Sequence, residues 1–290
     1  MRLLRMVLAV GLLGIGFAGC AKPIRHTDVA AAADMTTTAS VVQTASARYS
    51  QPMPNRIFSS SQLAGRTLEV ATTADIILRP GEVVLTFDDG PRAGKTPRIL
   101  DALDRYGVKA TFLMLGSAAK ANPALAQEVA RRGHTVGSHT YDHTDLTQLD
   151  RQAAIDEIAR GEAAVAAALG PERLSPFFRF PYLSQTGYLR TTLLQGDMVV
   201  LDVDIDSKDY FKDTAEVVTT RTLERLDARG SGIILFHDIH QRTVDMLPGF
   251  LADLEARGYS VVRLVPRTSG VFGRSVITAD APVDASPTTQ

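Results

Sequence analysis

The chain has 290 residues, of which 45% are apolar and 22% charged, enough for one sizeable hydrophobic core and ordinary for a globular protein. Its formal net charge of −1 gives no support for a nucleic-acid partner, so we expect none. The single cysteine, Cys20, excludes an intrachain disulfide and a cysteine-based metal site, and the lack of tryptophan leaves tyrosine and phenylalanine for stacking on a ligand.

The first twenty residues have the layout of a secretory signal. Two arginines precede an apolar stretch, Met6–Phe17, which is too short to span a membrane comfortably. The ending Ala18–Cys20 resembles the lipobox of bacterial lipoproteins, although Phe17 stands where leucine is typical. We therefore expect residues 1–20 to be a lipoprotein-type signal peptide and the protein to be exported to the cell envelope, with membrane attachment only through the signal or a lipid on Cys20. An ordinary cleaved signal or an uncleaved anchor are the alternatives.

Two segments without periodicity flank a regular region. Residues 21–78 are rich in Ala, Thr, Ser and Gln and predict a flexible tether, and residues 268–290 predict a disordered tail. Between them, residues 79–267 predict one folded domain in which apolar runs end at turn residues, as buried parallel strands do. The expected strands are Val83–Phe87, Ala110–Leu115, Thr135–Ser138, Phe177–Phe180, Met198–Leu201, Ile233–Phe236 and Ser260–Leu264.

The segments between these strands carry helical spacing, and a glycine follows most of them as a helix terminator. The helices so indicated include Thr96–Arg105, Pro123–Arg132, Arg151–Leu169, Thr214–Arg229 and Val244–Arg257. Repeated strand–helix units predict an α/β domain with a largely parallel sheet. About seven strands in fewer than 200 residues predict a distorted, incomplete (β/α) barrel, whose chemistry belongs at the carboxyl ends of the strands.

Polar clusters stand at those strand ends. The first expected strand runs into Asp88 and Asp89, and two adjacent carboxylates are costly to bury unless they bind a cation or hydrogen-bond donors. Adjacent residues of an extended chain point in opposite directions, so one can face a metal while the other has a different role. The alternative is a simple turn, for which Asp-Asp-Gly-Pro is a good sequence.

The third expected strand is followed by His139 and His143. Histidines at i and i+4 lie on one face of a helical turn and can chelate one metal ion, although many such pairs are surface residues. With Asp89 they would form a facial set of two histidines and a carboxylate that leaves positions open for water and substrate.

Three later strand ends also carry polar residues. Arg179 lies between phenylalanines, where burying its charge costs free energy unless it pairs with a carboxylate. The alternative is an arginine on the surface. Residues 202–209 hold four carboxylates, of which we expect one to reach the site. His237 ends the sixth strand, where a general acid could stand over the barrel mouth, and a capped loop histidine is the alternative.

Together these clusters resemble the polysaccharide deacetylase family with the NodB homology domain, also grouped as carbohydrate esterase family 4. The resemblance covers Pro80–Pro266, and the family's distorted (β/α) barrel agrees with the expected strand count. It rests on five motifs in the family's order, TFDDGP at Thr86–Pro91, SHTYDH at Ser138–His143, FRFPY at Phe178–Tyr182, DSKDY at Asp206–Tyr210 and ILFH at Ile234–His237.

The resemblance implies a role for each matching residue. Asp89, His139 and His143 match the family's metal ligands, for a divalent ion that is usually Zn²⁺. Asp88 matches the general base, and Arg179 matches the arginine that tethers it.

The same resemblance covers the acid side of the site and the substrate groove. His237 matches the general acid and Asp209 the carboxylate that tunes it. Tyr182 matches the position whose backbone N–H helps to bind the oxyanion, and Leu235 matches a residue lining the acetyl pocket. Tyr210 stands where the family commonly has tryptophan, at a position that borders the sugar-binding groove. This difference removes no catalytic group, but it leaves the identity of the sugar substrate open.

These expectations predict a metal-dependent hydrolase that removes N-acetyl groups from the amino sugars of an acetylated glycan. Peptidoglycan, chitooligosaccharides and poly-N-acetylglucosamine are the substrates left open. An O-acetyl esterase acting on a glycan such as xylan, an inactive glycan-binding lipoprotein on the same fold and a purely structural domain are the alternatives.

Overall fold

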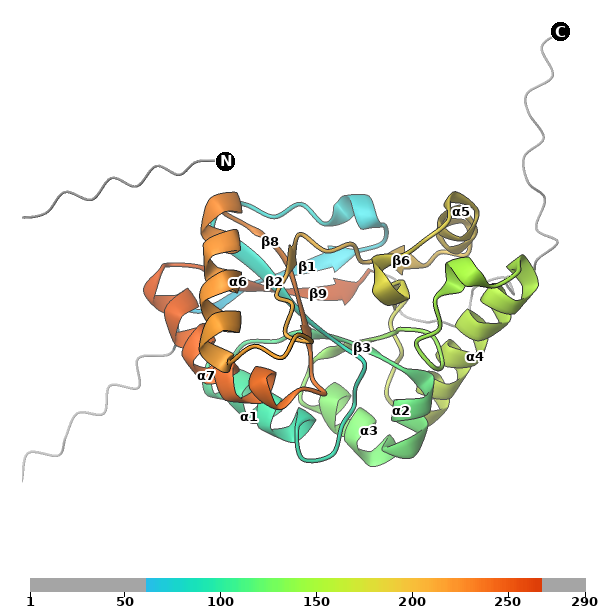
Figure 1. Ribbon diagram of the computed structural model, residues 1–290, viewed down its shortest axis with the longest axis horizontal. Helices are drawn as coiled ribbons and strands as arrows, with labels where there is room; N and C mark the ends of the chain where they lie inside the picture. The colour runs from blue at the N-terminus through green and yellow to red at the C-terminus, as the bar shows by residue number, and fades with distance from the viewer. Residues whose placement is uncertain (1–60, 268–290) are drawn as a thin grey trace, which may run out of the picture. The chain divides into compact units, whose positions relative to one another are not determined.

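The computed structural model describes residues 61–267, in which seven parallel strands form a nearly closed barrel (Figure 1). The order around the barrel is β6–β5–β4–β3–β2–β8–β7, and no pairing of the described strands joins β6 to β7. The predicted distorted, incomplete (β/α) barrel is thus confirmed. Its strands are β2 (Glu82–Asp88), β3 (Thr111–Met114), β4 (Thr135–Ser138), β5 (Phe177–Phe178), β6 (Val199–Val200), β7 (Ile205–Asp206) and β8 (Gly232–His237).

The register of the barrel places the polar clusters at one rim. Asp88 at the end of β2 pairs with Leu113 on one side and with His237 on the other. Ser138, directly before His139, pairs with Phe178. Because parallel strands end at the same edge, the residues that follow them converge there.

Seven helices of the described region cover the barrel from outside (Figure 1). Asp150, Thr186 and Thr214 each accept a hydrogen bond from a backbone N–H in the first turn of the helix that follows, so side-chain caps fix three of the helix starts. None of these helices is long and apolar enough to cross a membrane. They are α1 (Thr96–Arg105), α2 (Gly116–Ala121), α3 (Pro123–Arg131), α4 (Arg151–Leu169), α5 (Gly187–Gln195), α6 (Ala215–Arg229) and α7 (Gln241–Ala256).

The predicted tether is wrong for the part that the structure describes. A strand, β1 (Ala64–Val70), pairs in parallel with β9 (Ser260–Pro266), and β9 pairs in turn with the first two residues of β2. Most residues of β1 are exposed or half-buried, so the strand lacks the continuous apolar run by which the other strands were predicted. The predicted signal, the rest of the tether and the tail lie outside the described residues.

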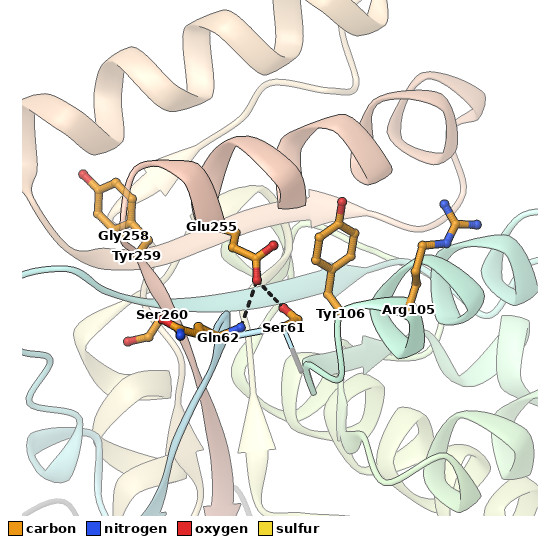
Figure 2. A pocket seen from close by; sticks show the side chains of 8 residues that line it. All are labelled: Ser61, Gln62, Arg105, Tyr106, Glu255, Gly258, Tyr259 and Ser260. Carbon is orange, nitrogen blue, oxygen red and sulfur yellow. Dashed lines mark hydrogen bonds between the residues drawn. The ribbon is translucent and has the colours of Figure 1, made fainter. Parts of the chain in front are cut away.

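A cavity of about 640 Å³ lies at the opposite, amino-terminal ends of the strands (Figure 2). There the carboxylate of Glu255 accepts hydrogen bonds from the Ser61 hydroxyl at 2.7 Å and from the Gln62 N–H at 2.9 Å. These bonds fasten the segment that leads into β1 to the end of α7. We assign this end of the barrel a structural role, since the polar clusters of the motifs lie at the other rim.

Candidate active site

Three side chains converge on one point of the carboxyl-terminal rim. The Asp89 Oδ1 atom lies 3.6 Å from His139 Nε2 and 3.6 Å from His143 Nε2. One ligand atom from each of the three residues falls within 4.8 Å of the other two. The sequence-based expectation that these residues meet is confirmed in its geometry.

The local conformation that brings the histidines together differs from the prediction. Residues 139–145 form an irregular loop, so the expected helical turn is wrong. Thr140 and His143 adopt φ of 69° and 60°, in the left-handed region that costs energy for residues other than glycine, and Asp89 does so at 75°. The Thr140 hydroxyl accepts a hydrogen bond from the His143 N–H at 3.2 Å and holds the bend.

The three residues fit a divalent cation. Asp89 Oδ1 is buried, and no residue among 61–267 hydrogen-bonds to it, an arrangement that is costly unless a ligand satisfies the oxygen. His139 Nδ1 lies 2.7 Å from the Arg179 carbonyl oxygen, so this nitrogen carries the proton and Nε2 presents its lone pair to the site. Burial lowers the pKa of His139 to about 3, which keeps the ring neutral as a metal ligand must be.

Asp88 and Arg179 form a buried pair beside this point. Arg179 is only 1% exposed, so the surface-arginine alternative is wrong. Its guanidinium donates to Asp88 Oδ1 at 2.8 Å and to the Leu201 carbonyl oxygen at 3.0 Å. Burial raises the pKa of Asp88, and the positive charge of Arg179 opposes this rise without cancelling it. The second carboxylate oxygen, Oδ2, faces the site at 3.8 Å from His139 Nε2.

His237 and Asp209 form a second buried pair, so the loop-histidine alternative is wrong. Asp209 accepts hydrogen bonds from the His237 ring at 2.6 Å, from the His237 N–H at 2.8 Å and from the Thr243 hydroxyl at 2.6 Å. Burial lowers the pKa of His237, but the hydrogen bond and charge of Asp209, helped by Asp89 and Asp88, outweigh it and raise the pKa to about 9. His237 Nε2 then points toward the site, 4.0 Å from Asp89 Oδ2.

A cavity of about 400 Å³ opens above these groups. Tyr182 is 67% exposed at its rim and packs edge-on against His143 with ring centroids 4.5 Å apart. Tyr210 stands near His237 and donates from its hydroxyl to Asp206 at 2.9 Å. The cavity is lined by Asp88, Asp89, His139, His143, Phe180, Tyr182, Leu183, Asp206, Tyr210, Leu235 and His237.

Comparison with known proteins agrees with this geometry. The family model for polysaccharide deacetylase matches residues 77–200. A chitin deacetylase of Colletotrichum lindemuthianum is 34% identical over 218 residues, which cover 70% of this chain and 86% of that protein. The chain belongs to the polysaccharide deacetylase family.

Other relatives of the chain include longer proteins. A peptidoglycan-N-acetylglucosamine deacetylase of Listeria monocytogenes is 33% identical over 194 residues, which cover 63% of this chain but only 38% of that protein. A solved peptidoglycan deacetylase of Bdellovibrio bacteriovorus superposes with a TM-score of 0.66 at 34% identity and covers 72% of this chain and 61% of its own. The chain thus spans well under half of the listerial relative.

The structure adds two residues of this family member that sequence reasoning did not single out. The Thr86 hydroxyl accepts from Arg179 at 2.8 Å and donates to the Ile234 carbonyl oxygen, also at 2.8 Å. Asp238 is buried and accepts from the Thr96 hydroxyl at 2.5 Å, beneath the turn that carries Asp89. In the sequence, Thr86 and Asp238 stand close to Asp88 and His237 at the strand ends, and this position could have marked them as candidates. The position alone does not reveal which residues they bind.

Proposed function

We propose that the protein is an exported, metal-dependent hydrolase that removes N-acetyl groups from amino sugars of a glycan. The observation that carries the proposal is the meeting of a cation site, a buried carboxylate and a protonated histidine around one cavity. Hydrolysis of an acetamide needs these three functions, because water must be activated, the oxyanion stabilised and the amine protonated as it leaves. The family relatives named as chitin and peptidoglycan deacetylases support it.

Asp89, His139 and His143 would hold the divalent ion, for which we propose Zn²⁺ because two imidazoles and one carboxylate are a common zinc set. Such an ion supplies Lewis-acid polarisation of an acyl oxygen and lowers the pKa of water. The chain contributes the orientation of the set: the Arg179 carbonyl fixes the tautomer of His139, and the Thr140 hydroxyl fixes the backbone of His143.

Asp88 is the proposed general base. Its Oδ1 atom is tied to Arg179, which leaves Oδ2 facing the cavity to accept a proton from the attacking water. The positive charge of Arg179 also opposes the rise in the pKa of Asp88 that burial causes, so the pairing favours the charged carboxylate that a base requires. Arg179 thus acts as a positioning residue for the base.

His237 is the proposed general acid. An amine is a poor leaving group until it is protonated, so the acid must carry a proton at neutral pH. The Asp209 carboxylate provides for this by holding the pKa of His237 near 9 and by fixing its ring through Nδ1, which leaves the Nε2 proton for transfer.

The cavity walls suggest how the substrate is held. We assign the Tyr182 backbone N–H to the oxyanion, as the resemblance to the family implies; the Tyr182 ring packs against His143 of the proposed metal set. Leu235 lies buried at the cavity base and would contact the acetyl methyl group. Tyr210 is exposed at the rim and offers an aromatic face to a sugar ring. Peptidoglycan, chitooligosaccharide and poly-N-acetylglucosamine remain the proposed substrate classes, reached from a lipid or signal anchor at Cys20.

The test is acetate release from chitopentaose by three proteins in parallel. The Asp88→Asn variant should fold and bind one Zn²⁺ per chain but lose at least about 10²-fold in kcat, the lower end of what general acid–base catalysis contributes. The His139→Ala variant should lose the metal. An Asp88→Asn protein with near wild-type turnover contradicts the base, and unchanged zinc content of His139→Ala contradicts the ligand set. Acetylxylan as a parallel substrate separates amide from ester preference.

A further inference from the structure

A second cavity adjoins the candidate active site on the side of α1 and α2. Its volume is about 680 Å³, and it shares Asp89 and His143 with the cavity described above. It extends from there over the turn before α1, the start of α2 and the segment that follows β8. A glycan whose reacting sugar lies at the cation site can therefore place neighbouring units in this second cavity, whose size falls within the range of about 300–1,000 Å³ typical of ligand sites.

Two cationic side chains line this second cavity. Arg92 is exposed and Lys95 is half-buried. Among residues 61–267, no ion pair and no side-chain hydrogen bond involves either head group. The two residues are bonded through their backbones: the Arg92 N–H donates to the Thr96 hydroxyl at 2.7 Å, and the Lys95 N–H donates to the Arg92 carbonyl oxygen at 3.1 Å. By contrast, Arg132, which follows α3, and Arg190 in α5 each reach a carboxylate at 2.7 Å. The charges of Arg92 and Lys95 are thus available to a ligand.

The charge of the two cavities differs. Asp88, Asp89 and Asp206 line the first, whereas Asp89 is the only carboxylate that lines the second among the described residues. Asp89 is assigned to the metal, whose charge would more than offset it. The second cavity therefore presents a net positive potential to the part of a glycan that flanks the reacting sugar.

We propose that this second cavity, with Arg92 and Lys95 on its wall, is a subsite for a sugar unit that carries an ionised carboxylate. The inference rests on the proposed function, which supplies the reacting sugar, and it narrows the substrate to an acidic glycan in which acetylated amino sugars alternate with carboxylate-bearing units. A guanidinium and an ammonium are suited to a carboxylate, the first through paired N–H donors and the second as a point charge. A neutral polymer of N-acetylglucosamine leaves both cations unused.

The experiment compares two substrates. Chitopentaose is neutral, and peptide-free strands of alternating N-acetylglucosamine and N-acetylmuramic acid carry a lactyl carboxylate on every second sugar. The double variant R92Q/K95Q is measured against wild type and against R105Q, which removes a charge at the far end of α1, in the cavity drawn in Figure 2. The readouts are kcat/KM for acetate release and glycan affinity by isothermal titration calorimetry.

In the double variant, the ratio of kcat/KM for the acidic over the neutral glycan should fall about tenfold, as expected for the loss of charge-assisted hydrogen bonds. It should stay unchanged in R105Q, and about 0.5 M NaCl should reduce it in wild type because exposed charges are screened. Equal losses on both substrates, or no loss on the acidic one, would overturn the subsite. If wild type released no acetate from either glycan, the proposed function would fail by itself. The affinities would then decide the subsite: weaker binding of the acidic glycan by R92Q/K95Q supports it, and unchanged binding overturns it.

Discussion

Gly161 lies in the middle of α4, where glycine is unfavourable, and its packing against the metal-binding loop explains its presence. A Cβ atom at this position would lie 2.3 Å from the Thr140 carbonyl carbon and 2.6 Å from the Tyr141 nitrogen. Ordinary contacts begin near 3.4 Å. In the Gly161→Ala variant, α4 and the loop must therefore separate by about 1 Å. Overpacking of this kind typically lowers the free energy of unfolding by about 1–3 kcal/mol.

The separation should reach the cation site, because Thr140 follows His139 directly and its hydroxyl holds the His143 N–H. A shift of about 1 Å in a catalytic group can cost about 10²-fold in rate. We expect Gly161→Ala to bind Zn²⁺ more weakly and to release acetate far more slowly than wild type. Urea unfolding, calorimetric zinc titration of chelator-treated protein and acetate release measure the three effects.

Gly249 provides the matched control. It lies inside α7, and no atom of the described part of the chain lies within 4 Å of a Cβ built on it. Gly249→Ala should therefore stabilise the protein by about 0.5–1 kcal/mol through helix propensity alone, with zinc affinity and turnover unchanged. If Gly161→Ala were stabilised like Gly249→Ala and kept its zinc affinity, the proposed coupling of α4 to the loop would be refuted.

Three further variants test buried groups whose charge or titration affects activity or stability. Asp209→Asn removes the charge that raises the pKa of His237 to about 9, while burial, which lowers that pKa, remains. Activity that needs the protonated ring is lost as pH rises through this pKa. The alkaline limb of the kcat/KM profile should therefore move down by more than one pH unit in the variant. Arg179→Gln leaves a buried carboxylate unpaired and should cost about 3–5 kcal/mol in urea unfolding; a loss below 1 kcal/mol would contradict the pairing. Burial lowers the pKa of His134 to about 3, below the value near 6.5 that an exposed histidine has, so between these pH values the unfolded state binds a proton that the folded state does not. Wild type should therefore lose stability as pH falls from about 6.5 toward 3, and His134→Asn should lose less in unfolding curves over the same range. An unchanged pH dependence in the variant would contradict this role of His134.

The strand ends could be predicted from the sequence because their signal is local. Buried parallel strands read as continuous apolar runs, and carboxylates or histidines directly after such runs are too costly to lie there without a partner. Since parallel strands end at one rim, the meeting of Asp89, His139 and His143 followed from topology alone.

What could not be predicted depends on partners far away in the sequence. The β1 strand is largely exposed and is held by pairing with β9, almost two hundred residues later, so its own residues carry no strand pattern. The i, i+4 spacing of His139 and His143 indicated a helical turn, but the loop instead bends through left-handed residues that α4 and Gly161 hold in place. Likewise, a carboxylate could be expected as the partner of Arg179, but its hydrogen bonds to the Leu201 carbonyl oxygen and the Thr86 hydroxyl appear only in three dimensions.

The most direct test of a metal-dependent deacetylase at this rim is acetate release from chitopentaose by chelator-treated full-length protein, titrated with Zn²⁺. We predict negligible release without metal and full recovery at one equivalent per chain, with no recovery in His139→Ala. Equal release with and without metal, or recovery in the absence of His139, would contradict a metal-dependent reaction at this site.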